Sequence, residues 1–188
     1  MAYFPMFMDM TNLKVLVVGG GAIATEKLEK LLDFTKEITV IALRVDEEAQ
    51  AMIDEHALTL HKRVYEVGDI KGFDIVIVAT DTQVLHKDIY EESRGSSILV
   101  NSVDNAAYCD FIFPSYVKKE DLTITFSTGG ASPAFAKQIR HYFEKVIPDS
   151  VGAFLQKMKV LRSTMPKGKA RMDYFDTLAR EYIDKHFS

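Results

Sequence analysis

The chain has 188 residues, of which 47% are hydrophobic, and it carries a formal net charge of −4. A chain of this length and composition can bury a full-sized core, so we expect a globular protein with one main domain and an appendage. The negative net charge argues against a general affinity for nucleic acid, which requires a basic surface. Apolar runs such as residues 15–18 and 75–79 fall far short of the roughly 20 residues that cross a bilayer, so we expect no membrane helix.

The cysteine and histidine content excludes two further kinds of site. The single cysteine, Cys109, cannot form a disulfide within the chain and is expected to act as a small packing residue. The five histidines are scattered along the sequence, so no zinc or redox-metal site is predicted. The first ten residues contain no basic residue and no secretory cleavage pattern. We therefore expect a protein of the reducing cytoplasm.

Short apolar segments alternate with helical patterns over the first hundred residues. This alternation is typical of βαβ units, and right-handed crossovers then favour an α/β fold with an open, doubly wound parallel sheet. The predicted strands are residues 14–18, 38–42, 58–62, 74–79 and 98–102. The predicted helices are residues 22–34, 47–56 and 82–93.

The pattern changes after residue 105. Residues 111–116 and 122–127 are predicted to be strands joined by a charged turn. Three helices are expected to follow, at residues 133–146, 151–161 and 174–186. The segment 163–169 contains a proline and a glycine and is the region where we expect mobility.

A glycine motif, Gly19-x-Gly21-x-x-Ala24, lies between the first predicted strand and the first predicted helix. In that context Gly19 permits the tight turn and Gly21 lets a pyrophosphate approach the backbone. The start of the helix supplies free N–H groups and the positive end of its dipole. The motif therefore favours dinucleotide binding, although similar turns also occur in doubly wound proteins that bind nothing there.

The second strand ends without the acidic residue that usually accepts the ribose hydroxyls of NAD. Leu43 and Arg44 occupy this region instead. Arg44 could pair with the 2′-phosphate of NADP, or it could be a solvated surface charge. The sequence leaves both interpretations open.

Polar residues also follow the fourth and fifth predicted strands, where the ligand crevice of such a sheet lies. Thr80 and Asp81 follow the fourth strand, and Thr82 is equally suited to cap the next helix. Asp104 follows the fifth strand with no evident helix to cap. A carboxylate there could accept a proton from a bound substrate, but Asp-Asn is also common in turns.

A second glycine loop consists of Ser127, Thr128, Gly129 and Gly130 and leads into the helix that starts near Pro133. Its backbone amides could contact an anionic substrate. An N-cap at Ser132 with Pro133 in the first turn would by itself explain the same residues.

Taken in order, these motifs resemble the precorrin-2 dehydrogenase family of sirohaem synthesis, which includes bifunctional dehydrogenase–ferrochelatases and the N-terminal part of sirohaem synthases. The resemblance covers nearly the whole chain. The matching segments are FPMFMDM, VLVVGGGAIATEK, VIVATDT, VNSVDNAAYCDFIFPSYV and LTITFSTGGASPAFAKQIR.

The resemblance implies NAD-dependent oxidation of precorrin-2 to sirohydrochlorin, and in bifunctional members insertion of ferrous iron. It implies a Rossmann domain at residues 1–112, a small α+β dimerisation region at 113–147, a helical C-terminal tail at 148–188, and a homodimer. It assigns catalysis to Asp104 and contacts with NAD to Ala22-Ile23 and Leu43-Arg44.

Two questions remain open at this level. The segment 157–171 holds six cations without an acid and could steer a polycarboxylate substrate, or it could be a solvated face. A module of another class, one that binds NAD(H) without turnover and signals through its C-terminal helices, would share the glycine motif. Conversion of precorrin-2 with formation of NADH distinguishes the enzyme from the sensor.

Overall fold

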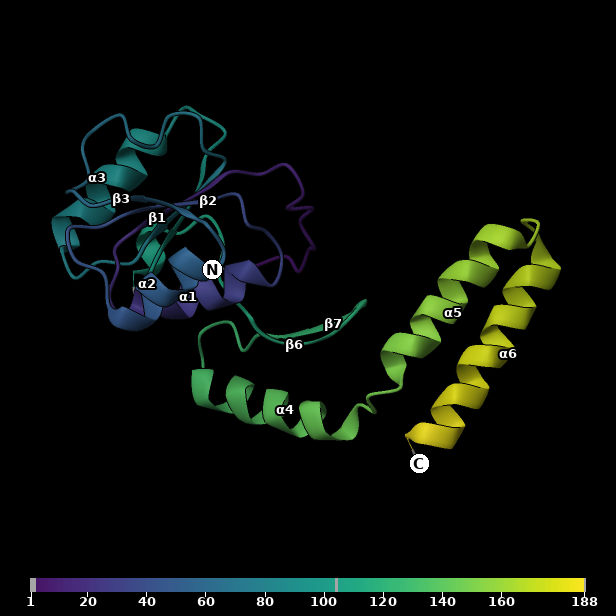
Figure 1. The fold of residues 1–188 in the computed structure, drawn as a ribbon. Helices are drawn as coiled ribbons and strands as arrows, with labels where there is room; N and C mark the ends of the chain where they lie inside the picture. Colours follow the sequence, from purple (N-terminus) through teal and green to yellow (C-terminus); the bar gives the residue numbers. More distant parts are fainter. Residues whose placement is uncertain (1–2, 104, 188) are drawn as a thin grey trace. The chain divides into compact units, whose positions relative to one another are not determined.

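The computed structural model describes residues 3–103 and 105–187 (Figure 1). The chain divides into two compact units, an N-terminal unit, Tyr3–Ile112, and a C-terminal unit, Phe113–Ser188. The predicted catalytic residue, Asp104, lies outside the described residues. Among those described, no helix combines the length and the apolar character needed to span a membrane.

The N-terminal unit is built on one parallel sheet with the strand order β3-β2-β1-β4-β5. The strands are β1 (Val15–Val18), β2 (Ile38–Ile41), β3 (Thr59–His61), β4 (Ile75–Val78) and β5 (Leu99–Ser102). Helices α1 (Ala22–Leu32) and α2 (Glu47–Glu55) lie on one face and α3 (Gln83–Ser93) on the other (Figure 1). The predicted α/β, doubly wound parallel fold is confirmed.

The two central strands explain why the sequence reads as continuous apolar runs. β1 has the sequence VLVV and β4 the sequence IVIV, and every residue of both is buried, as expected for strands covered on both faces. β1 pairs with both β2 and β4, so β2 and β3 lie on one side of β1, and β4 and β5 lie on the other. The strand order therefore reverses between β1 and β4. Their carboxyl ends therefore form the switch point at which such sheets bind ligands.

The strand predicted at residues 111–116 is wrong in position. After β5 the chain forms a short 3-10 helix, Ala106–Tyr108, and runs back along β5, where Asn101 Nδ2 donates to the carbonyl of Phe111 (2.8 Å). Pro114 has no N–H to donate to a ladder. The strand β6 accordingly begins after it, at Ser115–Lys119, and pairs antiparallel with β7, Leu122–Phe126.

Three helices complete the C-terminal unit: α4 (Pro133–Val146), α5 (Val151–Thr164) and α6 (Lys169–His186). The apolar cluster of this unit is formed by Val117, Ile147 and Val151, with partly buried residues from β7, α4, α5 and α6 around it. The residues of 113–147 and 148–188 thus share one core, and separate roles for the two segments stay a prediction.

Helix α6 begins at Lys169, five residues before the predicted start at Tyr174. The guanidinium of Arg171 donates to the carbonyls of Arg162 (3.2 Å) and Met165 (3.1 Å), which ties the first turn of α6 to the end of α5. Residues 165–168 of the segment 163–169 lie between these two helices, and the mobility of the segment stays a prediction.

Candidate nucleotide-binding site

A cleft of about 620 Å³ lies within the N-terminal unit at the carboxyl ends of β1, β2 and β4. Its walls are the glycine loop, the ends of β2 and β4, and a segment that includes Arg63 and Tyr65. All the residues predicted to bind the cofactor line this one cleft: Gly19, Gly21, Ala22, Ile23, Leu43, Arg44, Thr80 and Asp81. Residues separated by sixty positions in the sequence are thus brought together at the switch point.

The three positions of the loop hold glycine for different structural reasons. Gly19 has φ +123°, and a Cβ there would lie 2.0 Å from the carbonyl oxygen of Ala79. A Cβ on Gly20, a position with no predicted role, would lie 2.4 Å from the carbonyl of Arg44. A Cβ on Gly21 would meet only Asp46 Oδ2, at 3.9 Å. The first two glycines are therefore required by the protein's own packing, whereas the third leaves space for a ligand.

The start of α1 offers hydrogen-bond donors to that space. Gly21 is the N-cap, it makes no side-chain cap, and the first turn contains no acidic residue. The first N–H groups of a helix have no partner within it, and the dipole adds partial positive charge at the same end. This combination fits a diphosphate.

A carboxylate that sequence reasoning missed, that of Asp46, lies near the start of α1. The N–H of Asp46 donates to the carbonyl of Gly20 (2.8 Å), and the same residue places its carboxylate near Gly21. Asp46 lies two residues beyond Arg44, farther from the end of β2 than the usual position of a ribose acceptor. The signal that would have found Asp46 is its position in front of the helix α2, where it is the N-cap.

The far wall is held by an ion pair. Arg63 donates to both carboxylate oxygens of Asp69, at 2.6 and 2.8 Å. These hydrogen bonds lower the pKa of the Asp69 carboxyl. Arg44, by contrast, is exposed at the mouth of the cleft, and Leu43 beside it is 66% exposed. An exposed arginine agrees with either of the interpretations that the sequence left open.

The wall beside β4 is anchored by a buried histidine that the sequence did not single out. His86 of α3 contacts the carbonyl of Thr80 through Nε2 (2.7 Å) and the hydroxyl of Ser102 through Nδ1 (2.5 Å). Thr82 is the N-cap of α3 by position but makes no side-chain cap.

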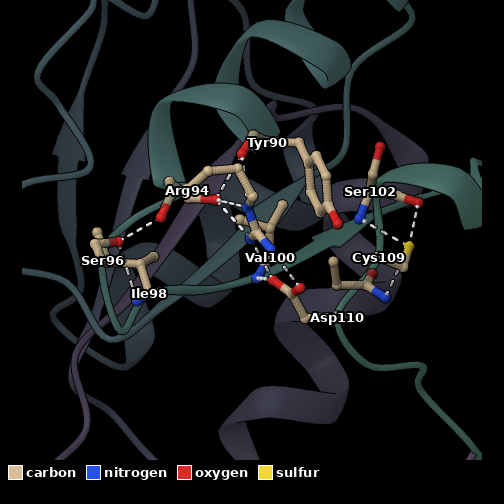
Figure 2. A network of polar contacts seen from close by, with 10 residues as sticks. Tyr90, Arg94, Ser96, Ile98, Val100, Ser102, Cys109 and Asp110 are labelled. Atoms are coloured by element: carbon tan, nitrogen blue, oxygen red, sulfur yellow. Dashed lines mark hydrogen bonds and ion pairs between the residues drawn. The ribbon is translucent and has the colours of Figure 1, made fainter.

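A set of polar contacts fastens the two ends of the segment 103–109, in which Asp104 lies in the sequence (Figure 2). Cys109 Sγ accepts from the N–H of Ser102 (3.2 Å) and donates to its carbonyl (3.1 Å). Burial raises the pKa of the Cys109 thiol. Asp110 accepts from the N–H of Val100 (2.8 Å) and from both terminal nitrogens of Arg94 (2.9 and 2.7 Å). The cysteine predicted to be a packing residue thus also forms hydrogen bonds.

The Arg94–Asp110 pair predicts a pH-dependent contribution to stability. Burial alone would raise the pKa of Asp110, but the hydrogen bonds from Arg94 and Val100 outweigh it and hold that pKa below the usual value for an aspartate. We expect Asp110→Asn to lower the free energy of unfolding by about 1–2 kcal/mol at pH 7, since hydrogen bonds to a charge are worth about 1.5–3 kcal/mol and Arg94 is partly exposed.

A depressed carboxyl pKa stabilises the fold above the unfolded pKa and loses this effect as the pH falls through the folded pKa. The difference between Asp110→Asn and the parent protein should therefore shrink as the pH falls below about 4 in denaturant titrations. Asp176→Asn, which removes an exposed pair with Arg180, is the control and should change little. An equal difference between Asp110→Asn and the parent at pH 7 and pH 3 would contradict the assignment.

The second glycine loop belongs to the C-terminal unit. Ser132 caps α4 by accepting from the N–H of Phe135 (3.2 Å), so the predicted N-cap is confirmed. Ser127 and Thr128 accept from backbone N–H groups of the same loop, while Gly129 and Gly130 have positive φ and open space where a Cβ would be. Contact of Ser127, Thr128, Gly129 and Gly130 with substrate stays a prediction.

The cations of the segment 157–171 are partly engaged in the fold. Lys159 pairs with Asp121 (2.5 Å), and the guanidinium of Arg162 lies 5.6 Å from the centre of the Phe175 ring. Arg171 bonds to carbonyls at the end of α5, as described above. Half of the six cations therefore have roles within the C-terminal unit, and a steering role would rest on Lys157, Lys167 and Lys169.

The fold and the cleft define a nucleotide-binding α/β protein, and comparison with known proteins identifies its kind. Residues 6–115 match the model of a family described as putative NAD(P)-binding. The chain belongs to this family. The match confirms the predicted class of cofactor, a nicotinamide adenine dinucleotide.

Two curated relatives confirm the resemblance seen in the motifs. The siroheme synthase of Pseudoalteromonas atlantica is 40% identical over 92% of this chain and 37% of its own length. The siroheme synthase of Methylococcus capsulatus is 34% identical over 94% of this chain and 38% of its own. The chain thus spans under two fifths of these relatives. The structure named "SirC, precorrin-2 dehydrogenase" shares the fold, with a TM-score of 0.81 at 24% identity over 98% of this chain and 91% of that one.

Proposed function

We propose that this chain is an NAD-dependent dehydrogenase that oxidises precorrin-2 to sirohydrochlorin in sirohaem biosynthesis. The observation that carries the proposal is the cleft at the switch point, where Gly21 leaves space beside the uncapped N–H groups at the start of α1, which suits a diphosphate. The names of the relatives supply the substrate class.

The chemistry needs few groups from the protein. When bound, the dinucleotide supplies the hydride acceptor. Its diphosphate would be held by Gly19, Gly21, Ala22 and Ile23. The rest of the dinucleotide would contact Leu43, Arg44, Thr80 and Asp81. Asp104 would accept the proton that leaves the tetrapyrrole. The loop of Ser127, Thr128, Gly129 and Gly130 would contact substrate carboxylates through its amides.

Two side chains of opposite charge bear on the choice between NAD and NADP. The carboxylate of Asp46, whose Oδ2 is 3.9 Å from the position of a Cβ on Gly21, could accept a ribose hydroxyl but would repel a 2′-phosphate. Arg44 at the mouth of the same cleft would attract that phosphate. Activity with both cofactors at equal concentration decides which of the two charges dominates.

The test is to incubate the purified protein with precorrin-2 and either NAD or NADP while the sirohydrochlorin spectrum is followed. We expect one NADH for each sirohydrochlorin. Addition of ferrous iron then tests the second activity, in which the macrocycle nitrogens would bind the iron and Asp104 would take up their protons. Binding of NAD(H) with no oxidation by either cofactor would reject the enzyme and favour the sensing module.

A homodimer belongs to the same proposal. Phe135 and Tyr142 of α4 are 58% and 62% exposed, an arrangement that suits contact with a second copy. Phe143 of the same helix, by contrast, packs against Phe126 with ring centres 5.2 Å apart, at the core of the unit. Sedimentation at micromolar concentration should show a dimer, and a monomer would contradict this part.

A further inference from the structure

His86 is a buried imidazole whose two ring nitrogens both have partners. It lies on α3 and is 1% exposed. Its Nε2 lies 2.7 Å from the carbonyl oxygen of Thr80, and its Nδ1 lies 2.5 Å from the hydroxyl of Ser102, which is also 1% exposed. This side chain is not among the groups proposed to bind the cofactor or the substrate.

For a neutral ring, the two partners determine which nitrogen carries the proton. A carbonyl can only accept, so Nε2 donates to Thr80. In the neutral ring Nδ1 is then an acceptor, and the hydroxyl of Ser102 donates to it. Each atom is satisfied in one arrangement of hydrogens, which makes the ring a rigid link, because an unpaired polar group at this depth would be costly.

The link joins two places that matter for the proposed reaction. Thr80 follows β4 and lines the nucleotide cleft. Ser102 ends β5, and its register partner on β4 is Val78, so the two strand ends are adjacent. The backbone of Ser102 is also held by Cys109, which closes the segment that contains Asp104 in the sequence. One ring therefore connects the cofactor wall to the base of the segment with the predicted proton acceptor.

We propose that His86 is a positioning residue that sets the cofactor wall at Thr80 and the base of the Asp104 segment relative to each other. This inference rests on the proposed function. Its physical basis is that reaction rates depend steeply on the placement of reacting groups, and small displacements are enough to slow an enzyme.

Two substitutions separate the two halves of the link. In His86→Gln the side-chain amide reaches the position of Nε2 and can still donate to Thr80, but it loses the acceptor for Ser102. In His86→Asn the amide oxygen occupies the position of Nδ1 and can still accept from Ser102, but the donor to Thr80 is lost. Ile89→Val, on the same helix and also fully buried, is the control for loss of stability alone.

In steady-state kinetics with precorrin-2 and NAD, the two variants should differ in whether kcat or KM changes. We expect His86→Gln to lower kcat at least about tenfold with the KM for NAD within about twofold, and His86→Asn to raise that KM several-fold with a smaller effect on kcat. Equal losses in both variants, or losses no larger than those of Ile89→Val, would overturn the proposal.

Two readouts do not depend on turnover. Nitrogen-15 spectra of the imidazole should show the neutral Nε2–H form, and calorimetry should show that His86→Asn, but not His86→Gln, weakens NAD binding. If the parent protein binds NAD but does not oxidise precorrin-2, the proposed function fails while these two readouts still decide the role of His86. An Nδ1–H ring, or equal NAD affinity in both variants, would overturn it.

Discussion

Replacing Asp104 with asparagine or alanine is expected to lower kcat for precorrin-2 oxidation by about 10²–10⁴, the usual contribution of a general base. NAD affinity should stay near that of the parent protein, because the residues proposed to hold the dinucleotide are on the glycine loop and the ends of β2 and β4. Asparagine keeps the shape of the side chain and removes only its basicity, so the two variants together separate chemistry from packing.

Single-turnover oxidation and calorimetry of NAD binding are the measurements. Asp88→Ala is a matched control, since Asp88 is an exposed acid on α3 outside the cleft lining. The proposal for Asp104 would be contradicted if Asp104→Asn turned over as fast as Asp88→Ala. If NAD binding were lost instead, the residue would belong to the cofactor site and the proton acceptor would have to be sought elsewhere.

The second large effect concerns the glycine loop, where neighbouring positions should fail in different ways. Gly19→Ala is expected to destabilise the fold by at least about 3 kcal/mol, because φ +123° is strained for alanine and its Cβ would overlap the carbonyl of Ala79. Gly21→Ala should change the free energy of unfolding by no more than about 1 kcal/mol, since φ −87° suits any residue and the Cβ has room.

Gly21→Ala should weaken NAD binding much more than it weakens the fold. The added methyl group would occupy the space through which a diphosphate approaches the amides, so we expect the affinity for NAD to fall at least about tenfold, or roughly 1.4 kcal/mol. Chemical denaturation and calorimetry on the same preparations provide both numbers. Unchanged affinity in Gly21→Ala would show that the diphosphate does not pass this position.

The N-terminal unit was predictable because its signals are local and agree with one another. The strands VLVV and IVIV are apolar throughout, and the glycine motif stands between a strand and a helix, so fold and cofactor loop follow from sequence spacing. Right-handed crossovers then place Thr80 and Asp81 at the same edge of the sheet as Gly19. No contact had to be known in advance.

What the sequence missed depends on contacts between distant residues. The start of β6 was misplaced because Phe111 looks like a strand residue, whereas its carbonyl is taken by the side chain of Asn101. The role of Asp46 required knowing that its backbone bonds to Gly20, and that of His86 required the register of β4 and β5. None of these contacts has a periodicity that sequence analysis can detect.

We propose that the amides between Gly19 and Ile23 bind the diphosphate of a nicotinamide dinucleotide. A crystal structure of the protein with NAD tests it most directly. We predict the diphosphate at the start of α1, next to Gly21, with the nicotinamide ring beside the segment that contains Asp104. A dinucleotide bound outside this cleft, or a nicotinamide ring far from Asp104, would contradict the account.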